Sequence, residues 1–371
     1  MNMNRTLKQA ALLLVLLLAV APMGVLAEAV VPAELDLAQD LDAVDDAIEL
    51  PELELDVPDP VSEAVSTPQD EAAENAGAVA INKTNFPDNV FRGYVKESFD
   101  TDGNGKLSQT EIDAVENIDV YNKGIASLKG VERFANLKTL SCISNRLKTL
   151  DISKNRKLEM LACSYNALTK LDLSKNAKLT LILCGNNELK TLDVSNLKQL
   201  ESLDCSDIGL TKLDVSKNTK LTQLLCAQNK LKALNVTRNT KLTFLSCWKN
   251  ALTKLDVSKN TKLTYLSCGN NKLKTFNVSK CTQLETMDCS NNQLTKLTLG
   301  SKKNLTSLYA YGNKLKSIDL KNCPILKKMV KEGSTSAIGN SVWFSDSDYH
   351  NMAIDNTTRL TDGNKVLYRG A

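Results

Sequence analysis

The sequence predicts a mainly β solenoid, in which short coils stack and each coil packs only on its neighbours. Three regularities support this prediction. Cysteine recurs every 21 residues, leucine recurs in step with it, and one template of apolar positions fills each period. The cysteines of this ladder are Cys142, Cys163, Cys184, Cys205, Cys226, Cys247, Cys268 and Cys289. Units of this kind bury their apolar side chains only when they are stacked, so a continuous array is expected.

The unit LTFLSCWKNALTKLDVSKNTK, which begins at Leu242, shows the template. In an extended segment, Leu245 and Cys247 lie on the same face because they are two residues apart. Leu255 and Val257 repeat that arrangement in the second half of the unit. The spacing predicts two short strands per coil and two parallel sheets around a dry interior. The asparagine three residues after each ladder cysteine is expected to hydrogen bond the backbone at the bend.

The nested pattern LxxLxCxxNxLxxLDVSKNxxL resembles the leucine-rich repeat, in the short form found in secreted bacterial proteins of the internalin type. It covers nine units from Leu137 to Ile325, and an irregular earlier coil begins at Ile118, so the solenoid is predicted over residues 118–326. The template is broken at Ile208, Cys281, Ala310 and Cys323. The resemblance implies stacked parallel strands and a role in protein–protein interaction or adhesion to a cell surface.

Residues 1–27 have the features of a signal peptide. Arg5 and Lys8 precede an apolar core, and a run of small residues suited to cleavage ends at Ala27. The apolar core is too short for a membrane span. The mature chain is therefore predicted to be secreted and extracellular, without a membrane span, and association with the cell surface stays open.

Charge is divided unevenly along the chain. Residues 28–79 hold sixteen acidic residues and no lysine, arginine or aromatic residue, which predicts a disordered acidic leader. Residues 80–371 carry 44 basic and 27 acidic side chains, a net charge of +17. Two interpretations follow: lysines that keep a long solenoid soluble, or a basic body that attracts an anionic polymer of the cell wall. Nucleic acid is not expected as a partner, because the chain carries an export signal.

A second motif, FDTDGNGKLSQTEI, precedes the repeats. Its twelve residues from Asp100 to Glu111 resemble the calcium-binding loop of an EF-hand, with Gly105 at the sharp turn. The implied ligands are Asp100, Asp102, Asn104, Lys106 through its backbone carbonyl, Ser108 and Glu111. Apolar periodicity predicts helices on both sides, so residues 80–117 are expected to form an EF-hand-like cap with calcium as cofactor. A plain Asp-Gly turn in a polar loop is the alternative.

The ten cysteines are predicted to be buried free thiols. Those of the ladder replace an apolar residue and point inward, with parallel Cβ vectors that disfavour bridging. Cys281 and Cys323 lie two coils apart, about 10 Å, which is too far for a disulfide. A zinc site is not expected, because no CxxC spacing occurs and His350 is the only histidine.

On the cysteine-bearing strand, the residues between the inward positions are predicted to face outward. Most are small or polar, and the exceptions are Met160, Tyr165, Leu181, Leu183, Leu225, Phe244, Trp248, Tyr265, Tyr309 and Tyr311. Phe244, Trp248 and Tyr265 fall in adjacent coils and would form an exposed aromatic patch, with a second patch at Tyr309 and Tyr311. Such patches bind proteins or stack on sugars, and scattered apolar residues without a role are the alternative.

Aspartate recurs in the second half of the units, with lysines two residues away on the same face. We interpret this column as a solvated charge ladder, not as a metal or catalytic row. Its members are Asp151, Asp172, Asp193, Asp214, Asp256 and Asp319. Residues 327–371 leave the repeat, and their apolar pattern with a hairpin turn at Gly363 predicts a C-terminal β cap over the last coil.

These features predict a secreted, monomeric binding protein that contacts a protein or a cell-surface glycan and holds one structural calcium ion. A wall-associated structural protein, held to anionic cell-wall polymer by its basic body, is the alternative. An enzyme is not expected, because no nucleophile motif is present and the aspartates belong to the repeat.

Overall fold

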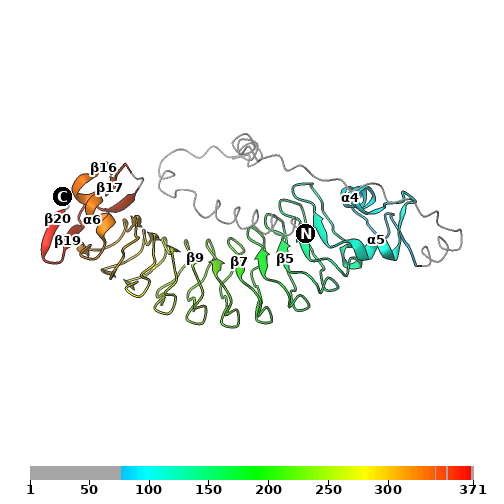
Figure 1. The fold of residues 1–371 in the computed structure, drawn as a ribbon, viewed down its shortest axis with the longest axis horizontal. Coiled ribbons are helices and arrows are strands. Elements are labelled where there is room, and N and C mark those ends of the chain that lie inside the picture. Colours follow the sequence, from blue (N-terminus) through cyan, green and yellow to red (C-terminus); the bar gives the residue numbers. More distant parts are fainter. Residues whose placement is uncertain (1–76, 339, 348–349, 369–371) are drawn as a thin grey trace, which may run out of the picture. The chain divides into compact units, whose positions relative to one another are not determined.

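The computed structural model describes residues 77–338, 340–347 and 350–368. The predicted signal peptide and nearly all of the predicted acidic leader lie outside the described residues. Within them, helices α4 and α5 precede a stack of coils, and helix α6 with five short strands follows it (Figure 1). The prediction of a mainly β solenoid built from stacked parallel strands is confirmed.

The main sheet takes one three-residue strand from each coil. Its ten parallel strands are β3 (Asn117–Asp119), β4 (Thr139–Ser141), β5 (Met160–Ala162), β6 (Leu181–Leu183), β7 (Ser202–Asp204), β8 (Gln223–Leu225), β9 (Phe244–Ser246), β10 (Tyr265–Ser267), β12 (Thr286–Asp288) and β14 (Ser307–Tyr309). From β4 to β14 each strand pairs with the next at an offset of one repeat, as Leu161 pairs with Ile182. Equivalent residues of successive repeats therefore lie beside each other in the sheet.

The inward positions form one continuous core. In each coil the middle residue of the strand and the ladder cysteine are buried, as Leu245 and Cys247 are. All ten cysteines are buried and free, as predicted. The stack of thiols thus packs as a column of small apolar groups.

The asparagines after the ladder cysteines join successive coils, as predicted. The Nδ2 group of Asn271 donates to the carbonyls of Cys247 at 3.0 Å and Cys268 at 3.1 Å. Its Oδ1 accepts from the backbone N–H of Leu252 at 2.9 Å. The equivalent residues are Asn145, Asn166, Asn187, Asn229, Asn250, Asn292 and Asn313. The backbone groups freed by the bend therefore find partners inside the protein.

The residue two positions after each ladder cysteine turns the chain with a left-handed backbone. Its φ lies between 50° and 55° in Ser144, Tyr165, Asn186, Asp207, Gln228, Lys249, Asn270 and Asn291. A non-glycine residue in this region is disfavoured by about 1–2 kcal/mol. The repetition of this strained turn shows that the bonds between coils outweigh its cost.

The aspartate column has a local role that the sequence analysis missed. Oδ1 of Asp151 accepts a hydrogen bond from the backbone N–H of Ser153 at 3.0 Å, and Asp256 accepts from Ser258 at 2.9 Å. Asn235 makes the same bond to the backbone N–H of Thr237 at 3.1 Å. The column therefore closes a tight turn in the coils that carry aspartate or asparagine at this position, and the carboxylates stay on the surface.

The second parallel sheet is smaller than predicted. Only β11 (Thr275–Asn277) with β13 (Lys296–Thr298), and β15 (Ser317–Asp319) with strands of the C-terminal cap, pair in this half of the coils within the described residues. Elsewhere the corresponding side chains, such as Val257, are buried without strand pairing. The apolar side chains in this half of the coils are therefore buried even where the backbone forms no sheet.

The N-terminal cap holds the loop predicted to bind calcium. It consists of β1 (Val79–Ala80), α4 (Asn89–Phe99), β2 (Lys106–Leu107) and α5 (Gln109–Ala114), followed by a short 3-10 helix at Val131–Arg133 in the first coil. Asp88 caps α4 through Oδ1, while its Oδ2 accepts from the backbone N–H of Ala126 at 2.8 Å. One carboxylate thus ties the helix to the first coil.

The C-terminal cap extends both sheets. It contains α6 (Pro324–Glu332), β16 (Ser334–Ile338), β17 (Ser341–Ser345), β18 (Asn351–Asp355), β19 (Arg359–Asp362) and β20 (Lys365–Tyr368). Strand β18 pairs with β14 and β19 with β15, both in parallel. The predicted hairpin turn joins β19 and β20, with Gly363 at a φ of 61°. Helix α6 begins at Pro324, inside the range predicted for the solenoid, and was not anticipated.

Replacing Asn271 by alanine is expected to lower the free energy of unfolding by about 2–4 kcal/mol, because two carbonyls and one amide lose a buried partner. Thr253→Ala, at an exposed position, is the control. Urea unfolding followed by circular dichroism measures both. Equal midpoints for the two variants would contradict the bonding role of the asparagines.

Acid should weaken the fold through the aspartate column. Hydrogen bonds from the serine two residues on hold the pKa of Asp151, Asp193, Asp214 and Asp256 below 3.8. The ionised form therefore stabilises the fold above that pH, and this contribution is lost as pH falls through the lowered values. Replacing these aspartates by asparagine, which Asn235 shows can make the same bond, should flatten the dependence of the urea midpoint on pH. An unchanged slope would exclude the column as its source.

Candidate functional site

The predicted calcium loop gathers three carboxylates. One oxygen from each of Asp100, Asp102 and Glu111 lies within 4.8 Å of the others. Oδ1 of Asp100 is buried and has no hydrogen-bond partner among the described residues. A buried carboxylate oxygen without a partner is costly, and a hard cation would supply one. The donor set fits calcium, which prefers carboxylate and carbonyl oxygens.

Glu111 is held by both ends of the loop. One carboxylate oxygen accepts from the backbone N–H of Thr101 at 2.6 Å, and the other accepts from that of Ser108 at 2.8 Å. Burial alone would raise the pKa of Glu111, but the hydrogen bonds from Ser108 and Thr101 outweigh it and lower the pKa. The carboxylate therefore stays ionised, as a metal ligand must. Thr101 was not singled out in the sequence.

The other predicted ligands take part in the loop's own hydrogen bonds. The Asn104 side chain donates to Asp102 at 2.5 Å and accepts from the backbone of Lys106 at 2.8 Å. Ser108 caps α5, since its Oγ accepts from the backbone N–H of Glu111 at 3.2 Å. Gly105 adopts the expected positive φ of 77°.

The loop is closed by strand pairing within the N-terminal cap. Strand β2, which contains Lys106, pairs in antiparallel fashion with β1. The cap is also tied to the first coil, because Arg133 donates to Asn85 at 2.7 Å and Phe134 packs on Phe86 and Phe99. A cation in the loop would therefore stiffen the end of the solenoid.

The strand face is the outward surface of the main sheet, and its aromatic residues are less exposed than predicted. Phe244 is only 6% exposed, because its ring stacks on that of Tyr265 at a centroid distance of 4.2 Å and an interplanar angle of 2°. Met160, Leu181, Leu183 and Leu225 are also buried. The prediction of an exposed patch at Phe244 is wrong, since side chains one coil away cover each other. Trp248 is half-buried, with the Lys249 ammonium 5.5 Å from its ring centroid.

The second predicted patch is completed by the C-terminal cap. The ring of Trp343, on β17, lies 6.1 Å from that of Tyr309 and 5.8 Å from that of Tyr311. All three side chains are half-buried. The repeat pattern did not predict Trp343 at this surface, because Trp343 lies outside the repeats. It reaches the surface through the pairing of β17 with β18 and of β18 with β14.

Two aspartates on the strand face were also missed, of which Asp288 is buried and Asp204 is half-buried. Asp288 accepts from the backbone N–H of Ser290 at 2.9 Å, and Asp204 accepts from that of Ser206 at 2.9 Å. Burial raises the pKa of both carboxyl groups. A Cβ atom on Gly269 would come within 2.7 Å of Asp288, so glycine is required beside it. Burial, with a contribution from the charge of Asp288, also raises the pKa of Tyr265 to about 12.

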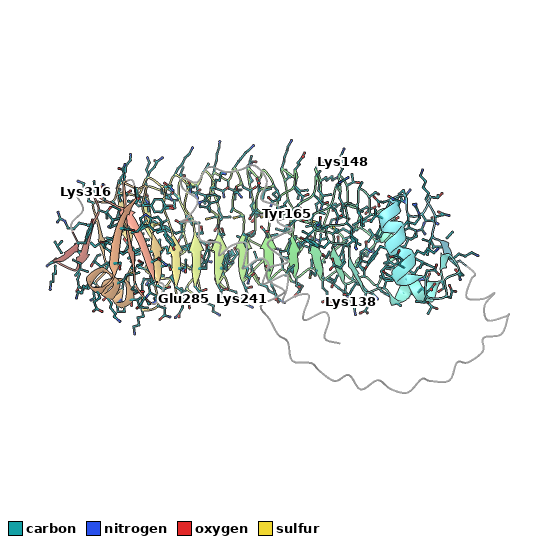
Figure 2. All side chains as sticks on the ribbon, turned by 90° about the horizontal axis from the view of Figure 1, so that it is seen from above. Lys138, Lys148, Tyr165, Lys241, Glu285 and Lys316 are labelled. Carbon is teal, nitrogen blue, oxygen red and sulfur yellow. The ribbon has the colours of Figure 1, made fainter. Side chains whose placement is uncertain are left out.

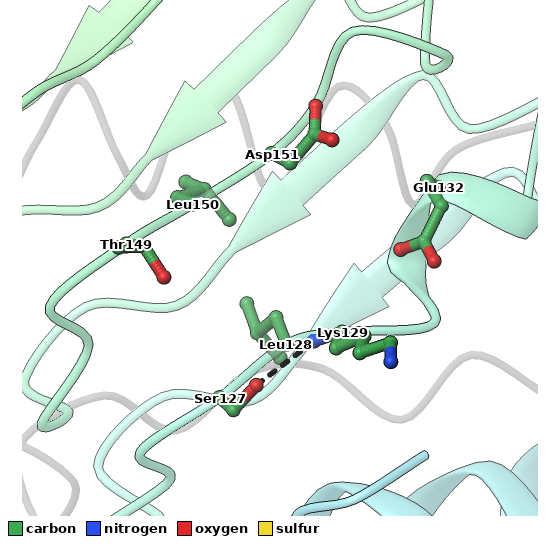
Figure 3. A pocket seen from close by; sticks show the side chains of 7 residues that line it. All are labelled: Ser127, Leu128, Lys129, Glu132, Thr149, Leu150 and Asp151. Atoms are coloured by element: carbon green, nitrogen blue, oxygen red, sulfur yellow. Dashed lines mark hydrogen bonds between the residues drawn. The ribbon is translucent and has the colours of Figure 1, made fainter. Parts of the chain in front are cut away.

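A polar groove of about 390 Å³ lies elsewhere, between the first two coils (Figure 3). It is lined by Ser127, Leu128, Lys129, Glu132, Thr149, Leu150 and Asp151. Ser127 Oγ accepts from the backbone N–H of Lys129 at 3.2 Å. None of the predicted site residues lines this groove.

The fold is a β solenoid of stacked leucine-rich coils, and parts of the chain are similar to internalins. The chain is 37% identical to Internalin J of Listeria monocytogenes over 70 residues, which are 19% of this chain and 8% of Internalin J. The functional domain of InlJ, described as including a cysteine ladder, is 22% identical with a TM-score of 0.37, covering 75% of this chain and 98% of that one. The internalin InlF is 21% identical with a TM-score of 0.48, covering 68% and 89%. No family model matches the chain.

Within the described part of the chain, no helix has the length and apolar character needed to cross a membrane.

Proposed function

We propose that this chain is a secreted leucine-rich-repeat protein that binds a protein partner at a cell surface through its strand face. The cluster of Tyr265, Asp288, Tyr309 and Trp343 supports this proposal. It places half-buried aromatic rings around a buried carboxylate: Tyr265, Asp288 and Tyr309 lie on the consecutive strands β10, β12 and β14, and Trp343 reaches Tyr309 from β17 of the C-terminal cap. Large aromatic side chains on a rigid scaffold are typical of interaction hot spots.

The chemistry of the cluster indicates the kind of segment it accepts. The pKa of Asp288 is raised because burial disfavours its charged form. A lysine or arginine of a partner would favour the ionised form of the Asp288 carboxylate. Its side chain would pack against the rings of Tyr265 and Tyr309. The partner is therefore expected to present a basic residue flanked by apolar ones.

Replacing Tyr265 by serine together with Asp288 by asparagine should weaken capture of surface-protein extracts at least tenfold, because the ring and the charge are both removed. Tyr121→Ser, at an exposed position in the first coil, is the matched control. Quantitative pull-down from envelope and host-cell extracts measures binding, and thermal unfolding confirms that each variant folds. Full retention of binding by the folded double variant would overturn the proposal.

Salt separates this function from attachment to an anionic polymer. Lys148 and Lys316 are exposed on one long side of the solenoid, and Lys241 is exposed on the other side together with Glu285 (Figure 2). Exposed lysines of this kind favour a polyanion of the cell wall as a second candidate partner. Binding through them would be lost in moderate salt, whereas binding through the aromatic cluster would persist.

We propose in addition that the loop from Asp100 to Glu111 binds one calcium ion and stabilises the N-terminal cap. The unpartnered Asp100 oxygen and the convergence of three carboxylates support this. Calcium at a hundredfold excess over its dissociation constant would stabilise the folded chain by about 2.7 kcal/mol.

Glu111→Gln should abolish the rise in melting temperature caused by calcium, because the ligand that spans the loop loses its charge. Glu97→Gln, on the exposed side of α4, is the control and should keep the response. Calorimetric titration of the metal-free protein gives the stoichiometry. Absence of calcium uptake by the wild-type chain would exclude the site.

A further inference from the structure

A second ladder of buried asparagines runs through the other half of the coils. Its members are Asn155, Asn176, Asn218, Asn239 and Asn260. Each donates from Nδ2 to two backbone carbonyls of the preceding coil, as Asn260 does to Val236 at 3.0 Å and Asn239 at 2.8 Å. This ladder therefore defines a repeated buried position beside backbone oxygens.

Three successive coils place different residues at this position. Cys281, Lys302 and Cys323 follow one another at the repeat spacing, and all three side chains are fully buried. The lysine thus lies one coil from a thiol on each side, about 5 Å in backbone spacing, whereas the two thiols lie about 10 Å apart. A disulfide between the cysteines is excluded by that distance, and the lysine is the neighbour that each thiol can reach.

Lys302 is held in a cradle of carbonyl oxygens. Its Nζ lies 2.6 Å from the carbonyl oxygen of Leu299 and 2.9 Å from that of Val278. Among the described residues no carboxylate forms an ion pair with it. Burial lowers the pKa of Lys302, which increases the share of neutral, nucleophilic amine.

Cys281 shares one carbonyl of this cradle through its backbone, and its Sγ donates to the carbonyl of Val257 in the preceding coil at 3.4 Å. The backbone N–H of Cys281 donates to the Val278 carbonyl at 2.9 Å, so this carbonyl contacts both residues. Burial raises the pKa of Cys281 and of Cys323 to about 11, and the charge of Lys302 opposes the rise. In the cysteine ladder, burial raises the pKa of Cys163 and Cys247 to about 12. The thiols beside Lys302 thus differ from those of the ladder in having a buried amine one coil away.

We propose that Lys302 and Cys281 form an oxidative cross-link in which one oxygen atom joins Nζ to Sγ. Hydrogen peroxide is the oxidant. The first peroxide converts the thiol to a sulfenic acid and releases one water. The second removes one hydrogen from the sulfenic acid and one from the amine as the O–N bond forms, and releases two waters. Two equivalents of a dithiol reverse the reaction: each is oxidised to its disulfide and supplies two hydrogens, which restore the thiol and the amine and release one water.

The link would join two adjacent coils near the C-terminal cap. Without it, these coils are held by hydrogen bonds and packing, and here the ladder amide is replaced by a thiol and an amine. A covalent bond across this junction would limit the opening of the last coils. Oxidation would therefore raise the melting temperature, and reduction would return it to the starting value.

The test treats the full chain with hydrogen peroxide and digests it without reductant. Mass spectrometry should find the peptides of Lys302 and Cys281 joined, with one oxygen gained and two hydrogens lost, and dithiothreitol should separate them. Lys302→Asn and Cys281→Asn restore the residue used elsewhere in this ladder, and both should abolish the link. Cys323→Asn should retain it.

Thermal unfolding provides a second measurement. Peroxide should raise the melting temperature of the wild-type chain and leave that of Lys302→Asn unchanged. Sulfenic or sulfinic acid at Cys281 with an unmodified Lys302 peptide would overturn the proposal. A link that survives in folded Cys281→Asn would also overturn it. The wild-type peptides decide between the linked and the unlinked products even if a variant fails to fold.

Discussion

Hydrogen bonds between coils in identical register hold this protein together. A three-residue strand makes too few ladder bonds to fix a neighbour by itself, and the repeat asparagines add side-chain bonds at the same junctions. Asn187 alone bonds the carbonyls of Cys163 and Cys184 and the amide of Leu168. Because the backbone groups at this bend are satisfied in this way, the leucines and cysteines can stack in a continuous core. The strained left-handed turn in every coil is tolerated for the same reason.

Both caps use bonds of the kind that join the coils. Strands β18 and β19 continue the two sheets, and Asp355 accepts from the backbone N–H groups of Gly312 and Asn313. At the other end, Asp88 accepts from Ala126 in the first coil. The candidate calcium loop belongs to that cap, so a bound cation would act on the stability of the array, at a distance from the strand face.

The unusual charged and reactive side chains of this protein lie at two kinds of position. Some occupy outward strand positions, which the repeat does not fix, and others replace a residue of the repeat. The strand face carries half-buried Asp204 and buried Asp288, each with a glycine beside it in the neighbouring coil. The second asparagine ladder is interrupted at Lys302, which lies between two thiols. In each case the surrounding coils supply a rigid, repeated frame, and one substitution places a reactive or charged group at a defined position in it. Such a frame can hold unusual side chains without losing its own bonds.

Local spacing was sufficient to predict the solenoid, the inward thiols and the bonding role of the asparagines, because these depend only on which positions repeat. The grouping of Asp100, Asp102 and Glu111 was predictable for a similar reason, since one short loop contains all three. Tertiary structure alone decided that Phe244 is covered, that Trp343 joins Tyr309 and Tyr311, and that Lys302 is buried. Those outcomes depend on the volume and direction of side chains one or more coils away. A repeating sequence defines where each position lies, but the neighbours across the stack define how much water reaches it.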